Sequence, residues 1–192
     1  HFIKVKGHSG VAGNEEAIID TNYRFFGRWE EEMQSENHKK TIYAAILGAG
    51  TVGTGVYKLC QEMKSEFVQK TGADLVVKKV LVRNASKKRE GIEDAVLTDN
   101  WKEIIEDPEI DIVIEVMGGI EPAKTYIIEA LEAGKQIVTA NKDLLAEHGQ
   151  EVMAAAEKAG ADLEFEAAVA GAIPIIRPLK QSMAVSYTHL RA

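Results

Sequence analysis

The sequence has a single cysteine, no long apolar run and no excess of positive charge, and each absence excludes a class of protein. Because Cys60 is the only cysteine in 192 residues, the chain cannot form an internal disulfide. No apolar run approaches the roughly 20 residues that a membrane-spanning helix needs. The formal net charge of −7 gives no general reason to expect binding to nucleic acid or to an anionic membrane. With no secretory signal at its start, the sequence predicts a soluble, cytoplasmic protein.

A glycine-rich turn is the most informative stretch that is present. An uncharged run from Ile42 to Leu47 is typical of a buried strand, and it ends at Gly48-Ala-Gly50-Thr-Val-Gly53. The residues after it predict a helix, because apolar side chains recur at helical spacing: Val52, Val56, Leu59 and Met63. Cys60 falls on that helix and is expected to be a packed thiol rather than a reactive one. A G-x-G-x-x-G pattern between a strand and a helix indicates a dinucleotide site.

Each residue of the turn has a physical role in such a site. Gly48 allows the tight turn, Gly50 lets the backbone approach a pyrophosphate, and Gly53 lets the helix lie close to the strand. The first helical residues, including Thr51 and Val52, offer unpaired N–H donors at the positive end of the helix dipole. These five residues are therefore the predicted phosphate-binding part of the site.

The chain after Thr41 alternates between apolar runs typical of strands and stretches with helical periodicity. This alternation predicts an α/β protein of the Rossmann type, with a doubly wound, mostly parallel sheet and helices on both faces. Expected strands cover residues 42–47, 75–82, 111–116, 136–140 and 162–166. Expected helices cover residues 52–70, 101–106, 122–133, 150–159 and 175–184, and Pro122 is expected at a first helical position.

Basic residues follow the second expected strand, where this kind of fold contacts the adenine ribose. An Asp or Glu there accepts hydrogen bonds from a 2′-hydroxyl, whereas an arginine accommodates a 2′-phosphate. The sequence offers Arg83 and then Lys87, Lys88 and Arg89, which favours NADP and leaves NAD possible. The alternative is an ordinary solvated basic loop.

Two further segments follow strands and should lie at the same edge of the sheet. Gly118 and Gly119 follow the third strand, and Lys142 follows the fourth. Ligands bind outside the carboxyl ends of parallel strands, so these residues are candidates for the cofactor crevice. Glu115 lies inside an apolar run and is expected to be a paired structural carboxylate rather than a catalytic group.

Residues 1–40 differ from the rest and are expected to be an extension, disordered or foreign to the remainder. The stretch from Ile3 to Glu15, which contains His8, resembles the C-terminal histidine loop of ribonucleases H. The carboxylates that two-metal catalysis needs are not in this chain, so His8 is expected to be catalytically idle and nucleic acid is not an expected partner. The polar stretch that follows is typical of a linker.

Four motifs in order resemble those of homoserine dehydrogenase. They begin at Leu47, Glu115, Thr139 and Phe165: LGAGTVGTG, EVMGGIEPA, TANKDLLA and FEAAVAGAIPIIR. The resemblance covers residues 41–183. It implies an oxidoreductase that interconverts L-homoserine and L-aspartate 4-semialdehyde with NAD(P), on the route to threonine, methionine and isoleucine. Full-length members are homodimers or homotetramers.

The same resemblance implies roles for particular residues. Lys142 would reach both cofactor and substrate and is the candidate catalytic residue, and Gly118 and Gly119 would lie beside the nicotinamide ribose. A structural sodium ion would be held in the segment after Phe165, by residues matching Glu166, Val169, Gly171 and Ile173. The loop is apolar and contains glycine, and its carbonyls need partners that a hard cation can supply.

The resemblance also divides the chain. Residues 41–166 would form the NAD(P)-binding domain, and residues 167–185 would begin a substrate and dimerisation domain that is cut short. Residues 186–192 leave the family pattern and look like translated adapter sequence. Since the substrate acids and the proton-donating lysine would lie further on, the fragment is expected to be inactive. The alternative is a dinucleotide-binding sensor or regulatory module without catalytic activity.

Overall fold

The computed structural model describes residues 40–169, and every element named below lies in that range. Several sequence expectations fall outside the described residues, among them the histidine motif around His8, the helix at residues 175–184 and the tail at residues 186–192.

One parallel sheet of six strands organises the described residues, in the order β3-β2-β1-β4-β5-β6. The chain runs outward from β1 to β3 and then returns to place β4 on the other side of β1. This is the Rossmann strand order, so the predicted fold is confirmed. The strands are β1 (Lys40–Leu47), β2 (Ala73–Leu81), β3 (Leu97–Thr98), β4 (Ile110–Glu115), β5 (Gln136–Thr139) and β6 (Leu163–Glu164).

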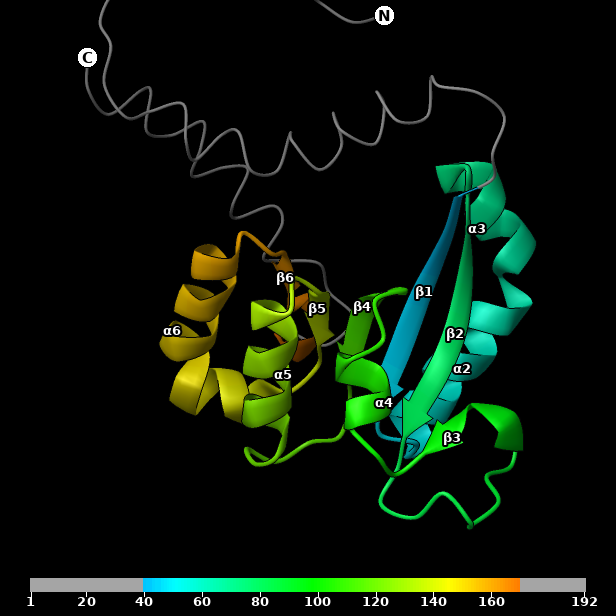
Figure 1. Ribbon diagram of the computed structural model, residues 1–192, viewed down its shortest axis with the longest axis horizontal. Coiled ribbons are helices and arrows are strands. Elements are labelled where there is room, and N and C mark those ends of the chain that lie inside the picture. Colours follow the sequence, from blue (N-terminus) through cyan, green and yellow to red (C-terminus); the bar gives the residue numbers. More distant parts are fainter. Residues whose placement is uncertain (1–39, 170–192) are drawn as a thin grey trace, which may run out of the picture. The chain divides into compact units, whose positions relative to one another are not determined.

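Helices cover the sheet on two sides, as Figure 1 shows, with α2 and α3 on one side and α4, α5 and α6 on the other. The connections that run to opposite sides of β1 are what place the helices on opposite faces. The helices are α2 (Thr51–Glu62), α3 (Lys64–Thr71), α4 (Lys102–Ile105), α5 (Ala123–Glu132) and α6 (Lys142–Ala159). Two 3-10 helices cover Asp94–Val96 and Glu166–Ala168.

Neighbouring residues of one strand pack in two separate hydrophobic cores. On β1, Ile46 packs with Tyr57 of α2, whereas Leu47 belongs to the core beneath α5 and α6. Successive side chains of a strand point to opposite faces, so one uncharged run supplies both cores. Ile127 and Leu131 are fully buried on α5, as their spacing predicts.

The first helix is two helices rather than the single one expected over residues 52–70. Met63 separates α2 from α3 with φ −91° and ψ 11°, outside the helical region, while Gly72 ends α3 in the left-handed conformation. The buried side of α2 also differs from the apolar series that predicts the helix. Gly53 and Tyr57 face the sheet, while Val52, Leu59 and Met63 are 57%, 53% and 38% exposed. Cys60 is half-buried against the core, as expected, and burial raises the pKa of its thiol.

Helix α6 begins at Lys142, so the expected start near residue 150 is wrong. Gly149 interrupts the apolar pattern in the sequence, yet it is buried within the helix. The backbone bends at His148, where φ is −127°, and the helix continues on both sides. The start is fixed instead by Asn141, whose side chain accepts a hydrogen bond from the backbone N–H of Leu144.

Smaller differences concern the ends of elements. β6 stops at Glu164 rather than near residue 166, and a 3-10 helix follows it. Pro122 lies one position before the first residue of α5 instead of within the helix. The strand β3 was not expected, because two residues carry no periodicity. No helix within residues 40–169 has the length and apolar character needed to cross a membrane.

Candidate cofactor site

The strand register brings the ends of four strands into one row. Its members are Leu81 of β2, Leu47 of β1, Glu115 of β4 and Thr139 of β5. Each of the segments singled out in the sequence begins within three residues of this row, on its carboxyl side. The structure therefore brings the glycine turn, the basic loop, the double glycine and Lys142 to one edge of the sheet. The point where strand order reverses, between β1 and β4, lies at its centre.

The glycine turn is as tight as its sequence requires. Gly48 has a φ of 104°, and its N–H donates to the carbonyl oxygen of Leu81 at 2.9 Å. A Cβ on Gly53 would overlap the carbonyl oxygen of Gly48 and crowd Val116 of the neighbouring segment. Both positions therefore need glycine for the fold itself.

Gly50 is different, because a Cβ built on it would meet no atom within 4 Å. Its φ of −80° suits any residue, so neither packing nor backbone conformation explains the glycine. Gly50 is also the N-cap of α2, where no side chain caps the helix and the first turn holds no acidic residue. Gly50, Thr51 and Val52 are exposed there. The start of α2 thus has free N–H donors and open space for an anion, which fits a dinucleotide pyrophosphate.

The basic loop after β2 is open to solvent at this edge. Arg83 and Lys87 are both exposed. Within residues 40–169, neither side chain forms an ion pair or hydrogen bond, whereas Lys88 lies 3.9 Å from Asp94. Two cations beside the predicted ribose position are therefore available to a ligand.

The double-glycine turn after β4 is held by a buried carboxylate. Gly118 and Gly119 have φ values of 72° and 74°, which other residues rarely adopt. Glu115 is fully buried, and its carboxylate accepts hydrogen bonds from the N–H groups of Met117 at 2.8 Å and Gly118 at 3.3 Å. It also accepts one from the hydroxyl of Thr139 at 2.7 Å. Its partners are thus hydrogen-bond donors, which suits the structural role expected of it.

Lys142 is the first residue of α6 and is exposed at the same edge. Asn141 precedes it, is buried, and donates from Nδ2 to the carbonyl oxygen of Gly119 at 2.6 Å. The sequence analysis assigned no role to Thr139 or Asn141, although both lie in the TANKDLLA motif. The signal for Asn141 was available, since an asparagine three residues before an apolar pair is a usual helix cap.

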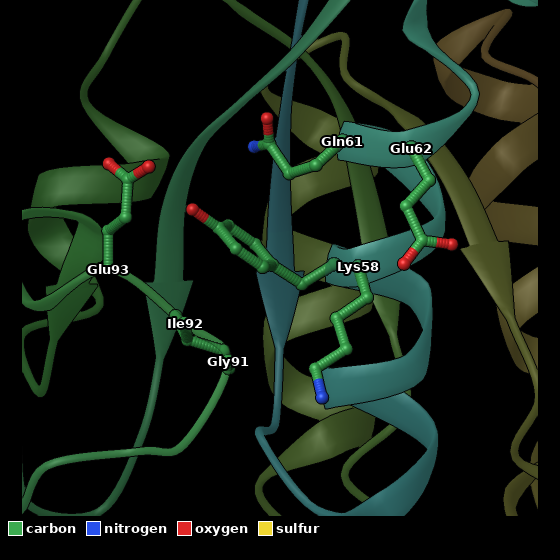
Figure 2. A pocket seen from close by; sticks show the side chains of 7 residues that line it. Lys58, Gln61, Glu62, Gly91, Ile92 and Glu93 are labelled. Atoms are coloured by element: carbon green, nitrogen blue, oxygen red, sulfur yellow. The ribbon is translucent and has the colours of Figure 1, made fainter.

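Two hollows among the described residues lie elsewhere. The one in Figure 2, about 510 Å³, lies between the second half of α2 and the loop at residues 91–93. Its lining includes Lys58, Gln61 and Glu93, and neither it nor the second hollow includes the glycine turn.

Two of the four residues expected to hold sodium, Gly171 and Ile173, lie outside the described residues. Glu166 opens the 3-10 helix that follows β6, and its carbonyl oxygen accepts a hydrogen bond from the N–H of Val169 at 3.2 Å. Within residues 40–169, no group of three or more His, Cys, Asp or Glu side chains is placed to hold a metal ion.

The comparison with known protein families agrees with this geometry. A model of the NAD-binding domain of homoserine dehydrogenase matches residues 48–166, from the glycine turn to the end of the sheet. The chain belongs to the homoserine dehydrogenase family. The family resemblance found in the motifs is thereby confirmed, and the matched region is a nicotinamide dinucleotide-binding domain.

Relatives in this family are similar over most of this chain. A homoserine dehydrogenase of Bacillus subtilis is 46% identical over 145 residues, which are 75% of this chain and 34% of that protein. One of Lactococcus lactis is 49% identical over 156 residues, or 78% of this chain and 36% of that protein. The chain thus spans about a third of the length of these relatives.

Solved structures of family members have the same fold. The homoserine dehydrogenase of Thiobacillus denitrificans matches with a TM-score of 0.72 and 40% identity, over 78% of this chain and 35% of that chain. A hyperthermophilic archaeal homoserine dehydrogenase, solved in complex with NADPH, matches with a TM-score of 0.59 and 25% identity. That match covers 72% of this chain and 48% of the archaeal chain.

Proposed function

We propose that this chain is the cofactor-binding part of an enzyme that transfers a hydride between NADP and the pair L-homoserine and L-aspartate 4-semialdehyde. The observation that carries the proposal is the start of α2, where Gly50 has no structural reason to be glycine and leaves the N–H donors open. Membership in the family supports this reaction, and the start of α2 is the proposed binding position of the dinucleotide.

Different residues along the edge of the sheet would bind different parts of the cofactor. Gly50, Thr51 and Val52 would hold the pyrophosphate through backbone N–H groups, and Gly118 and Gly119 would lie against the nicotinamide ribose. The bound dinucleotide supplies or accepts the hydride. Lys142 would place its ammonium near the substrate oxygen, where it stabilises the negative charge that develops as a carbonyl becomes an alkoxide.

Binding tests this proposal directly. The 192-residue chain should bind NADPH, measured by calorimetry, and Gly50→Ala should abolish most of that binding because the added methyl occupies the approach to the phosphates. The variant should unfold at nearly the same temperature as the wild type, since Gly50 has open space around it. A Gly50→Ala chain that binds NADPH normally would contradict this placement of the pyrophosphate.

The basic loop supports NADP as the preferred dinucleotide. Arg83 and Lys87 are exposed and free of partners within residues 40–169, so both can meet a 2′-phosphate. Replacing Arg83 with Ala should weaken NADP binding about tenfold or more, since a hydrogen bond to a charged group is worth roughly 1.5–3 kcal/mol. NAD binding should change little. Equal losses for both dinucleotides would show that Arg83 supports the loop instead.

Two finer parts of the proposal concern catalysis and sodium. The chain alone should not turn over homoserine, because it spans only about a third of its relatives, and measurable turnover would overturn that expectation. A structural sodium ion is the second of these parts. It would bind carbonyl oxygens of Glu166, Val169, Gly171 and Ile173. A carbonyl has two lone pairs, so the bond that Glu166 already accepts leaves it able to bind a cation. A melting temperature that is the same in sodium and in a bulky organic cation would contradict this site.

A further inference from the structure

Glu115 is a buried carboxylate in a position that the sheet itself does not explain. It is 0% exposed at the end of β4, and it has no cation among its bonded partners within the described residues. Burying a carboxylate is unfavourable unless hydrogen bonds replace its hydration. Three donors do so here: the N–H groups of Met117 and Gly118, and the hydroxyl of Thr139. The carboxylate therefore joins the turn after β4 to the end of β5.

A second connection joins the same two segments further out. The hydroxyl oxygen of Thr139 accepts a hydrogen bond from the N–H of Asn141 at 3.0 Å, and Nδ2 of Asn141 donates to the carbonyl oxygen of Gly119 at 2.6 Å. Together these hydrogen bonds form a closed ring. It runs from Glu115 through the double-glycine turn to Asn141, and from Asn141 through Thr139 back to Glu115. We call these contacts the Glu115 ring.

The ring joins two pieces of the proposed site, the double-glycine turn and the start of α6. Met117 and Ile120, on either side of the turn, pack against the core, whereas a Cβ on Gly118 or Gly119 would meet nothing within 4 Å. No packing contact therefore fixes the two glycines themselves. On the other side of the ring, Oδ1 of Asn141 caps α6 by accepting from Leu144 N at 3.2 Å. Lys142 follows Asn141 directly, and its backbone position is set by this cap.

We infer that Glu115, Thr139 and Asn141 are positioning residues that lock the Gly118–Gly119 turn and Lys142 into one arrangement for the nicotinamide half of the cofactor. The inference rests on the proposed function, because it assigns the nicotinamide to this turn. It separates the site into two halves: the ring serves the nicotinamide side, while the start of α2 and Arg83 serve the phosphates and the adenosine side.

Two probes distinguish the halves in the 192-residue chain. NADPH occupies both, whereas adenosine 2′-phosphate 5′-diphosphate keeps the adenosine, its 2′-phosphate and the pyrophosphate and lacks the nicotinamide together with its ribose. Asn141→Ser keeps an oxygen that can cap α6 and removes the donor to Gly119. Thr139→Val removes the hydroxyl at nearly the same volume. Each variant should weaken NADPH binding about tenfold and the nicotinamide-free probe less than twofold, and Thr139→Ser should restore the wild-type ratio.

The chain offers a matched control at the same edge. Thr98 of β3 is also buried, and its hydroxyl accepts from the N–H two residues on, that of Asn100, at 3.1 Å. This repeats the geometry of Thr139 and Asn141 outside the ring. Thr98→Val should therefore leave the ratio of the two affinities unchanged. A similar change of the ratio in Thr98→Val would show that loss of any buried hydroxyl produces it.

The results that would contradict the positioning role differ from those that would contradict the proposed function. Equal weakening of both probes in the ring variants, or no weakening, would contradict the positioning role. If the wild type binds neither probe, the proposed function fails, and amide hydrogen exchange of the free chain still tests the ring. Thr139→Val should speed exchange at Met117 and Gly118 at least tenfold relative to Thr98→Val, and unchanged exchange would overturn the inference.

Discussion

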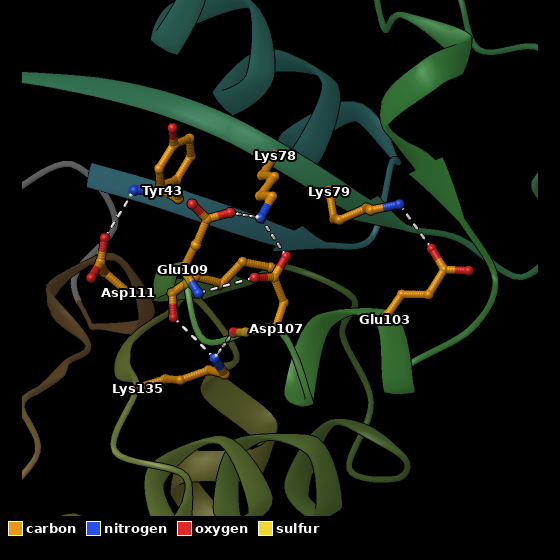
Figure 3. Close-up of polar contacts among 9 residues, drawn as sticks. Tyr43, Lys78, Lys79, Glu103, Asp107, Glu109, Asp111 and Lys135 are labelled. Carbon is orange, nitrogen blue, oxygen red and sulfur yellow. Dashed lines mark hydrogen bonds and ion pairs between the residues drawn. The ribbon is translucent and has the colours of Figure 1, made fainter. Parts of the chain in front are cut away.

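The two ends of the parallel strands satisfy their buried polar groups in different ways. At the carboxyl ends, Glu115 and its partners form hydrogen bonds without a cation, and the surrounding turns leave backbone N–H groups open. At the amino ends of β4 and β5, charged side chains form a network of ion pairs. Figure 3 shows this second network, in which lysines reach carboxylates that precede β4 and carbonyl oxygens before and at its first residue.

The amino-end network ties the loop before β4 to its neighbours. Lys78 of β2 lies 2.6 Å from carboxylate oxygens of both Asp107 and Glu109, and it passes 5.4 Å from the ring centroid of Tyr43. Lys135, only 5% exposed, donates to the carbonyl oxygens of Asp107 at 2.8 Å and Ile110 at 3.0 Å. Burial lowers the pKa of Lys135, against the attraction of Asp107 and Asp111.

This difference indicates which end of the parallel strands is suited to bind a ligand. The lysines and carboxylates at the amino ends are bound to each other, so little charge is left for an outside molecule. At the carboxyl ends, Arg83, Lys87 and the start of α2 are left without partners among the described residues. Changes at the amino ends should therefore alter stability alone, and changes at the carboxyl ends should alter binding as well.

The largest effect is expected for Gly53→Ala, at the carboxyl ends. The added methyl would overlap the carbonyl oxygen of Gly48, so α2 must move away from β1. Overpacking of this kind costs about 1–3 kcal/mol of unfolding free energy, occasionally more, and NADPH binding should be lost with it. Urea unfolding and calorimetry measure the two effects. A stable variant that binds normally would show that the close approach of helix and strand is not required.

A smaller effect on stability alone is expected for Lys135→Met, at the amino ends. The change leaves the carbonyl oxygens of Asp107 and Ile110 without their donor, which costs roughly 1–3 kcal/mol. NADPH affinity should stay within twofold of the wild type. Lys79→Met is the control, because Lys79 pairs with the exposed Glu103, and this change should lower stability less than Lys135→Met does. A loss of NADPH affinity in Lys135→Met would break the separation of the two ends.

The smallest effect is expected for Asp107→Asn, and it depends on pH. The hydrogen bond from Lys78 is the main cause that holds the pKa of Asp107 below its ordinary value of 3.8. The folded carboxyl thus binds protons more weakly than the unfolded one, so its contribution is complete well above pH 3.8 and is lost as the pH falls through the lowered pKa. The wild type should be more stable than the variant at pH 6, and the difference should vanish in acid.

Urea unfolding of both proteins from pH 6 to pH 2 measures this convergence. Added salt should narrow the difference at pH 6, because part of it comes from an ion pair near the surface. A gap between the two proteins that persists unchanged to pH 2 would contradict an electrostatic cause. It would point instead to the bond that Asp107 accepts from the N–H of Glu109.

Five of the six strands in the described residues, and the edge that carries the candidate cofactor site, could be predicted from the sequence alone. Gly48 and Gly53 are required by backbone conformation and by contact between elements close in sequence, so their spacing predicts the turn that the structure contains. The strand ending at Leu47 was predicted from an uncharged run, and the strand at residues 111–116 from a largely apolar run that contains Asp111 and Glu115. Because parallel strands place their carboxyl ends together, the candidate residues were expected at one edge before any distance was known.

Tertiary structure decided what depends on partners distant in sequence. The break at Met63 contains no glycine or proline, and the helix beginning at Lys142 continues through a glycine that reads as an interruption. Thr139 meets Glu115 across 24 residues only because the register of β4 and β5 aligns them. Local periodicity reports which side of an element is apolar, but it carries no information about which buried donor finds which acceptor. That pairing is fixed when the strands align, and it places Asn141, directly before Lys142, beside the double-glycine turn.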